Sequence, residues 1–533
     1  MPDTPAWVRD AVFYQVFPDR FAGSQRVVKP GPLEPWDAPP TNHGFKGGDL
    51  LGIVEHLDHI ESLAVNALYL TPVFQSASNH RYHTYDYFRV DPLLGGDEAL
   101  RELLDAVHAR GMRMLLDGVF NHTGRGFWPF HHVLETGAGS PYRTWFYFDE
   151  EALARGVPLN AYPAAGRLRN GVATDEPAIG ETEGHPGEKP SARQHLGYEA
   201  WWGLPALPKL NIGEPAVREY IWGVAEHWLR FGIDGWRLDV PGEIDDPSFW
   251  AEFRRRCRAV NPEAYLVGEI WGVAPEWVAG DRFDALMNYP LAKAIIGFVG
   301  GSSLDEPLLR SHDEYGQAER LDGAGFARRL GELTVAYAPE TVAAQLNLLG
   351  SHDTPRAFSL FGRDREAMEL AVLLQATLPG APCLYYGDEI GLEGGLDPDS
   401  RRAFPWDEGR WDHELLELVR GAFRLRRAEP ALRADGVEVR STVEGGLAFE
   451  RRAGDRRLGV AVNAADAPVR LDAGNAGDAG AVDATARAGA PGPTVLLAAG
   501  RARTEPPAVR GGGAEGAWSV ELPPRSGVVV ALA

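Results

Sequence analysis

Short apolar runs recur along this chain, and their alternation with amphipathic stretches limits the folds available to it. Each run holds four to six residues rich in β-branched and aromatic side chains, which is typical of strands buried on both faces. Eight runs fit this description: Val12–Phe17, Ala67–Leu70, Met112–Leu116, Gly235–Val240, Ala264–Val267, Phe283–Met287, Gln345–Leu349 and Pro382–Tyr386. Segments between them carry apolar residues at helical spacing, namely Asp97–Ala109, Pro215–Phe231, Pro247–Val260 and Arg363–Leu378.

This alternation predicts parallel βαβ units, and eight such units predict a closed α/β barrel, the (β/α)8 or TIM barrel. An open, doubly wound sheet is the structural alternative. No glycine-rich phosphate-binding fingerprint follows the first run, which disfavours that alternative.

Two regions lack the alternation of buried strands and amphipathic helices, and each of them is interpreted as a further domain. Residues 121–211 are rich in Gly, Pro and aromatic residues, and we expect no regular helix there; this segment is interpreted as domain B, inserted after the third strand. From residue 430 short alternating runs predict a C-terminal antiparallel β-sandwich, domain C. The barrel, domain A, then comprises residues 1–120 and 212–429, and domain C comprises residues 430–533.

Net charge, cysteine number and the length of the apolar stretches disfavour several kinds of partner and structure. The 533 residues carry a formal charge of −22, which disfavours nucleic acids and anionic membranes as partners. The two cysteines, Cys257 and Cys383, lie in apolar surroundings and predict neither a disulfide framework nor a zinc cluster. The sequence shows no signal peptide and no uninterrupted apolar stretch long enough to span a membrane, so we expect a cytoplasmic protein.

Acidic side chains end several predicted strands, where barrel enzymes place their catalytic groups. Asp239 and Glu269 end consecutive strands, and neighbouring strands lie about 4.8 Å apart. Retaining glycosidases need two carboxyl groups only about 5 to 5.5 Å apart, one as nucleophile and one as acid. The pair therefore favours a retaining glycosidase, with Asp353 as a third carboxylate.

The surroundings of the two carboxyl groups predict different protonation states. Arg237 lies two positions before Asp239 on the same strand face, so we expect its charge to keep Asp239 ionised. Apolar neighbours are expected to raise the pKa of Glu269 and keep it protonated. A single acid at a strand end is more often a cap or an ion-pair partner, and Asp117 is interpreted as structural on that ground.

Four segments in chain order resemble the signature regions of the α-amylase superfamily of glycoside hydrolases: DGVFNH (117–122), GWRLDV (235–240), VGEIW (267–271) and NLLGSHDT (347–354). LPKLN (207–211) resembles the fifth region of the neopullulanase, cyclomaltodextrinase and maltogenic amylase branch. Members of that branch usually begin with an extra β domain. Because the first barrel strand starts by about residue 12, we expect that domain to be absent.

The resemblance implies roles for individual residues. Asp239 is the implied nucleophile, Glu269 the acid/base and Asp353 the stabiliser of the transition state. The implied substrate-binding residues are His122, Arg237, His352, Tyr82 (with Tyr85 as the second candidate for the stacking tyrosine), Trp271, Asp397 and Arg401.

The resemblance also bears on metals and subunits. Relatives that bind calcium after the first strand carry an Asn/Asp-rich loop, whereas the loop after Phe21 reads AGSQRVVKPG and only Asp49 offers a carboxylate. Asn121 is a candidate calcium ligand elsewhere, but Glu243 stands where a histidine is expected. No cofactor is required on this interpretation, and calcium is left open. The oligomeric state is also open, and the dimer of the branch is not assumed.

The leading hypothesis is hydrolysis of α-1,4-glucosidic bonds in maltooligosaccharides or starch with retention, with transglycosylation and cyclodextrin hydrolysis left open. A 4-α-glucanotransferase or a disaccharide-forming isomerase on the same scaffold is the alternative enzyme. An inactive glycan-binding scaffold is the alternative of another class, and three intact carboxylates disfavour it.

Overall fold

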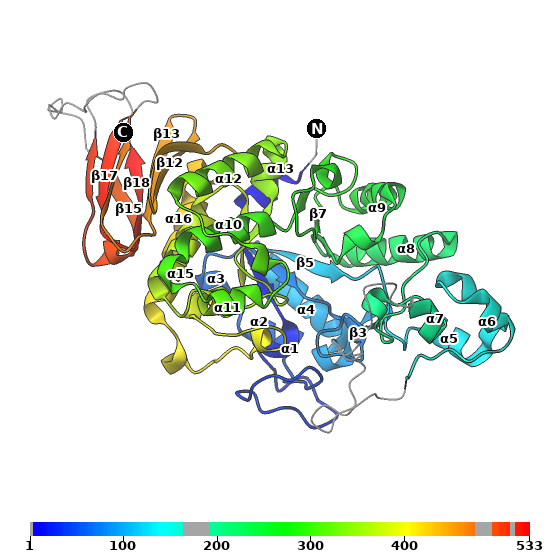
Figure 1. Cartoon of the computed structure of the whole chain (residues 1–533). Coiled ribbons are helices and arrows are strands. Elements are labelled where there is room, and N and C mark those ends of the chain that lie inside the picture. Colours follow the sequence, from blue (N-terminus) through cyan, green and yellow to red (C-terminus); the bar gives the residue numbers. More distant parts are fainter. Residues whose placement is uncertain (1–3, 164–191, 475–492, 512–516, 533) are drawn as a thin grey trace.

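The computed structural model describes residues 4–163, 192–474, 493–511 and 517–532. A parallel barrel lies at the centre, with the segment containing α5 to α7 on one side and the C-terminal sheets on the other (Figure 1). The predicted fold class, a (β/α)8 barrel followed by an antiparallel β region, is confirmed.

The barrel contains all eight predicted strands, each within two residues of its expected bounds. They pair in parallel in the order β8-β7-β6-β5-β2-β1-β10-β9, and a parallel bridge between Met287 and Leu346 joins the two ends of the sheet. Their bounds are β1 Phe13–Val16, β2 Ala67–Leu70, β5 Arg113–Gly118, β6 Gly235–Leu238, β7 Tyr265–Gly268, β8 Ala285–Leu286, β9 Leu346–Leu348 and β10 Ala381–Tyr385.

Amphipathic helices surround the barrel and bury their apolar faces against it. The helix α8 (Pro215–Phe231) shows how the sequence sets the ends: Glu214 caps its first turn, Pro215 occupies the first position, and Gly232 with φ 118° ends it. The other long helices are α4 (Gly96–Ala109), α9 (Pro247–Val260), α10 (Tyr289–Val299), α12 (Gly323–Val335), α15 (Arg365–Thr377) and α16 (His413–Ala428).

The inserted segment follows β5, the third barrel strand, as expected. The expectation that it holds no regular helix is wrong, because α5 (Trp128–Thr136) lies within it, followed by the short helices α6 (Glu150–Ala154) and α7 (Ala192–Leu196). Pro129 in the first turn and Gly137 at the end delimit α5, and Phe130 and Val133 bury its apolar face. The predicted domain boundaries themselves stay predictions.

Two antiparallel sheets form the C-terminal region. One has the order β11-β12-β13-β18-β15 and the other β14-β17-β16. Their bounds are β11 Glu438–Val443, β12 Gly446–Ala453, β13 Arg456–Asn463, β14 Val469–Ala473, β15 Thr494–Gly500, β16 Ala508–Gly511, β17 Trp518–Leu522 and β18 Ser526–Leu532. Trp518, Leu471 and Val530 are among the buried residues that pack between the sheets.

Buried arginines join the barrel to this C-terminal region. Arg426 on α16 donates to the carbonyl oxygens of Ala376, Leu378 and Leu432 at 2.9 to 3.1 Å, and also to that of Gly380. Arg451 on β12 donates to the same carbonyl of Leu432. These bonds satisfy backbone acceptors where the chain leaves the barrel.

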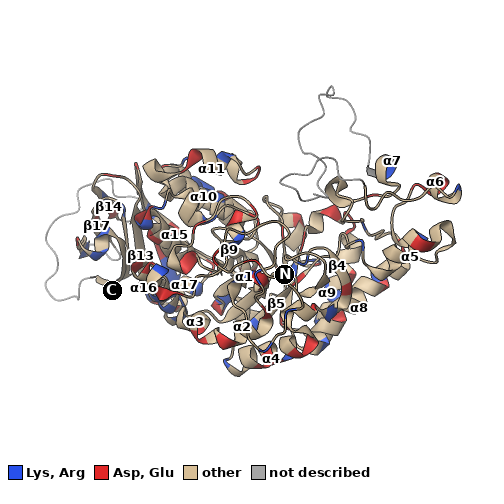
Figure 2. Ribbon diagram, turned by 90° about the horizontal axis from the view of Figure 1, so that it is seen from below, with Lys and Arg blue, Asp and Glu red and all other residues tan. Residues whose placement is uncertain are grey.

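The outer surface carries charges of both signs. Acidic and basic positions both occur along the outer helices α4, α8 and α9 (Figure 2). Among the residues that the structure describes, none of the helices combines the length and apolar character needed to cross a membrane.

Candidate active site

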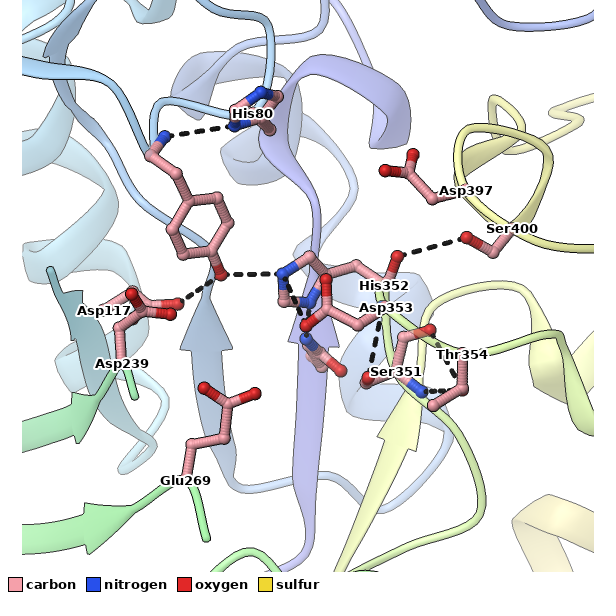
Figure 3. Close-up of polar contacts among 12 residues, drawn as sticks. His80, Asp117, Asp239, Glu269, Ser351, His352, Asp353, Thr354, Asp397 and Ser400 are labelled. Carbon is pink, nitrogen blue, oxygen red and sulfur yellow. Dashed lines mark hydrogen bonds and ion pairs between the residues drawn. The ribbon is translucent and has the colours of Figure 1, made fainter. Parts of the chain in front are cut away.

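Acidic side chains converge at the carboxyl-terminal edge of the barrel. Asp117 lies in β5, Asp239 and Glu269 directly follow β6 and β7, and Asp353 lies in the loop after β9. Figure 3 shows the four around one space. The register explains part of this convergence, because Asp117 is paired with Arg237 across β5 and β6.

Arg237 is the centre of this cluster. Its fully buried guanidinium donates to both carboxylate oxygens of Asp117 at 2.8 and 2.9 Å and to Oδ1 of Asp239 at 2.9 Å. Its second terminal nitrogen lies 2.9 Å from Oε2 of Glu269. One cation thus contacts three carboxyl groups, so Asp239 and Glu269 are held next to each other.

The pKa of Glu269 follows the expected direction. Burial is the largest cause and raises the pKa to about 7, while Arg237 opposes the rise and Asp353 adds to it. The backbone N–H of Val240 donates to Oε2 at 3.0 Å. Glu269 therefore keeps its proton up to neutral pH, as a general acid must.

The expectation for Asp239 was wrong in direction. Burial raises its pKa well above the usual carboxyl range, and Arg237 only partly offsets this, because Glu269 and Asp117 add negative charge nearby. The sequence argument counted the arginine and omitted the desolvation of the carboxyl group that it contacts. The hydrogen bond that Arg237 donates to Oδ1 of Asp239 at 2.9 Å favours the ionised form and is the main contact that opposes this rise.

Of the four acids that end the barrel strands, Asp353 is the most exposed, with a side chain 32% accessible. Burial would raise its pKa, but the positive groups around it, the guanidiniums of Arg401 and Arg237 among them, outweigh this and lower the pKa below its usual value. Arg401 lies 3.2 Å from Oδ1 of Asp353 and 3.0 Å from Asp397. Asp353 therefore stays ionised at the mouth of the site, and Asp397 lies beside it.

A hydrogen-bonded chain connects Asp117 to the loop after β9. The hydroxyl of Tyr82 donates to Asp117 at 2.8 Å and lies 2.7 Å from Nε2 of His352. The amide nitrogen of Gln15 lies 3.0 Å from Nδ1 of His352, and because an amide nitrogen only donates, the imidazole proton is on Nε2. Burial lowers the pKa of His352 to about 3, so the ring is neutral.

The two candidate tyrosines occupy different places. The Tyr82 ring stacks on that of His352, with centroids 5.4 Å apart and planes inclined by 4°. The Tyr85 ring instead packs against Gly124 and Gly126 in the inserted segment. The structure therefore brings Tyr82 into the cluster and places Tyr85 beside it.

His122 and Trp271 are the two predicted substrate-binding residues that lie next to the acids in the chain, His122 just after β5 and Trp271 two residues after Glu269. His122 is fully buried, and its Nε2 has no hydrogen-bond partner among the described residues. Burial lowers its pKa to about 3. Trp271 is partly buried and stacks on Tyr289 at a centroid distance of 3.7 Å. A neutral imidazole and an indole therefore flank the carboxylates, and both can contact a neutral sugar.

The two places considered for calcium hold few carboxylates among the residues that the structure describes. Oδ1 of Asn121 is buried without a partner among the described residues, but no three acidic, histidine or cysteine side chains group around a common point there. Glu243 pairs instead with Lys209 at 3.3 Å. In the loop after β1, the ammonium of Lys29 lies 2.9 Å from Oδ2 of the buried Asp49, so a protein cation already neutralises that carboxylate.

Sequence reasoning missed several residues that shape the site. Gln15 and Tyr69 lie inside apolar strands, and Tyr69 donates to Asp117 at 2.9 Å. Trp201 stacks on His122 with centroids 4.8 Å apart and planes inclined by 6°. The signal available for Gln15 and Tyr69 was a polar atom in an otherwise apolar barrel strand.

A closed parallel barrel with acidic side chains gathered around one arginine at its carboxyl-terminal edge is the arrangement expected of a barrel glycosidase. The Alpha amylase, catalytic domain family matches residues 15–419. The chain belongs to the α-amylase family and is one of its glycosidases, as its motifs indicated.

Individual proteins are similar to this chain in sequence, and two solved structures are similar to it in fold as well. A cyclomaltodextrinase from Bacillus sp is 41% identical over 431 residues, 80% of this chain and 68% of that protein. The solved debranching enzyme from Nostoc punctiforme is 42% identical, with a TM-score of 0.82 and 100% of both chains covered. The cyclic α-maltosyl-(1→6)-maltose hydrolase from Arthrobacter globiformis is 34% identical, with a TM-score of 0.78, 99% of this chain and 100% of that chain covered.

Proposed function

We propose that this protein hydrolyses α-1,4-glucosidic bonds in maltooligosaccharides and starch with retention of configuration. Asp239 is the nucleophile, Glu269 the acid/base and Asp353 the stabiliser of the transition state. The observation that carries the proposal is the contact of one buried guanidinium, that of Arg237, with both Asp239 and Glu269 at 2.9 Å. This places two carboxyl groups side by side, as the double displacement requires.

In the first step Glu269 donates its proton to the glycosidic oxygen while an Asp239 oxygen bonds to the anomeric carbon, and the leaving sugar departs with that proton. In the second step Glu269, now ionised, takes a proton from water, whose oxygen displaces Asp239. Asp353, ionised at the mouth, stabilises the positive charge that develops on the sugar ring.

The neighbouring residues position the sugar. His122, His352 and Arg237 contact the sugar ring at the cleavage point, and Tyr82 offers its face. Trp271 contacts the leaving-group side. A second group, Asp397 and Arg401, binds the next sugar. No metal is needed for these steps, because the side chains supply both charge and proton.

The test is activity of purified variants on maltooligosaccharides, with product anomers followed by NMR. Asp239→Asn and Glu269→Gln should each lose at least about a thousandfold in kcat. Asp281→Asn, an exposed acid in the loop beyond β7, is the matched control and should keep full activity. Near-normal turnover by Asp239→Asn, or β-configured initial products, would remove the proposal.

A second candidate function is cleavage of α-1,6 bonds. It is favoured because the solved structures that match this chain over their whole length are a debranching enzyme and a hydrolase of an α-1,6-linked cyclic sugar. The Nostoc debranching enzyme and the Arthrobacter hydrolase each cover at least 99% of both chains, whereas the Bacillus cyclomaltodextrinase matches over 68% of its own length. Parallel assays on maltohexaose, pullulan and β-cyclodextrin separate the specificities. Counting reducing ends in the same assays separates hydrolysis from glucanotransfer, because hydrolysis creates new reducing ends and transfer conserves them.

We also propose a cytoplasmic location. An intracellular maltogenic amylase from Bacillus subtilis, 34% identical over 434 residues, supports it. Fractionation of the producing cells tests this directly, and activity found only outside the cells would contradict it.

A further inference from the structure

Trp202 combines high exposure with an unfavourable backbone conformation. Its side chain is 77% accessible, and its backbone has φ 52° and ψ 17°, in the left-handed region that bulky residues rarely adopt. Folding normally buries tryptophan and selects glycine or asparagine for such a backbone. Neither burial nor backbone preference accounts for a tryptophan at position 202, which points to a functional role for its side chain.

The surrounding loop holds this conformation firmly. The N–H of Trp201 donates to the carbonyl of Leu207 at 2.9 Å, and the N–H of Gly203 donates to the carbonyl of Ala200 at 3.0 Å. Below them the buried Tyr198 hydroxyl donates to the carbonyl of Pro205 at 2.7 Å. The loop, which follows α7, therefore presents the indole of Trp202 from a fixed support.

A continuous ring stack connects Trp202 to the candidate active site. The rings of Trp202 and Trp201 lie 4.4 Å apart and are inclined by 17°, and Trp201 in turn stacks on His122. His122 belongs to the edge that carries Asp117 and Asp239. The outermost face of this stack is thus an extension of the site and not an isolated surface feature.

We propose that the exposed indole of Trp202 binds a glucosyl ring of a longer α-glucan, in a subsite beyond the sugar held at the cleavage point. This rests on the proposed function. The apolar C–H face of a pyranose packs on a flat aromatic ring, and a rigid indole loses little conformational freedom on binding. The neutral charge of the stack fits a neutral polysaccharide.

The test is the dependence of kcat/KM on chain length from maltotriose to maltoheptaose. Wild type should gain activity as the chain reaches Trp202. Trp202→Ala should lose about tenfold on the longest substrates, mainly through KM, and stay within twofold on maltotriose. Trp202→Phe, which keeps a ring, should restore most of the gain.

Trp128→Ala is the matched control, because Trp128 is 62% exposed on α5 of the same inserted segment and lies outside the stack. Its chain-length profile should equal that of wild type. Equal profiles for wild type and Trp202→Ala would overturn the subsite while leaving the proposed function intact. An inactive wild type would overturn the function instead. A change of molecular mass in Trp202→Ala, seen by light scattering without a change in KM, would assign the indole to contact between copies of the chain.

Discussion

Glu269 makes the stability of this protein depend on pH in a way that one substitution removes. Burial raises its pKa to about 7 in the folded protein, whereas its ordinary value is 4.5. Between these values the folded protein binds a proton that the unfolded chain has lost, so stability falls as the pH rises through this window. The loss reaches about 3 kcal/mol once the pH exceeds the folded pKa.

Glu269→Gln keeps the shape of the side chain and removes this titration. We expect the free energy of unfolding of the variant, relative to wild type, to increase by about 3 kcal/mol between pH 4.5 and pH 8. Urea unfolding followed by tryptophan fluorescence at several pH values measures this difference. In wild type, kcat/KM should fall over the upper part of the same range, as Glu269 loses the proton that it donates.

The matched control is Glu276→Gln, which neutralises an exposed glutamate in the same loop region. Its stability difference from wild type, measured at the same pH values, is the baseline against which that of Glu269→Gln is compared. A constant difference between wild type and Glu269→Gln over the whole range would refute the reasoning. Such a result would mean that Glu269 does not hold a proton with a raised pKa in the folded protein.

Three further substitutions test other contacts. Tyr82→Phe removes the hydroxyl bonded to Asp117 and should lower kcat/KM on maltooligosaccharides about tenfold with little change in melting temperature. Lys29→Ala leaves the buried Asp49 without its cation and should destabilise the fold by about 3 kcal/mol, whereas EDTA should leave the wild-type melting temperature unchanged. Arg426→Met leaves backbone carbonyls unpaired and should lower the melting temperature while kcat stays normal.

The barrel could be predicted from the sequence because each of its strands is buried on both faces. Such strands read as continuous apolar runs, and all eight lie within two residues of their predicted bounds. The helix α5 was missed for the opposite reason. Its sequence, WPFHHVLET, mixes aromatic and histidine residues on both faces, so the helical period is hidden until the inserted segment packs around Phe130.

The positions of the acids could also be predicted, because the ends of parallel strands meet at one edge. The raised pKa of Glu269 could be predicted from its apolar neighbours in the sequence, but that of Asp239 could not, because its desolvation depends on packing that the sequence does not display. Asp239 illustrates this: its arginine neighbour was visible two positions away, but its burial was not. The same limit hid Trp201, which lies 79 positions from His122 along the chain and stacks on it in the fold.

Asp117 takes no part in the bond changes of the proposed reaction, but it affects the protonation of the acid that does. Interpreted from the sequence as structural, it accepts hydrogen bonds from Tyr69, Tyr82 and Arg237 in the structure. Its negative charge compensates the buried guanidinium, so Arg237 does not act on Glu269 as an unopposed cation. Asp117 is itself one of the charges that raise the pKa of Glu269. The acid that gives up the proton thus depends on an aspartate two strands away, through an arginine that contacts both.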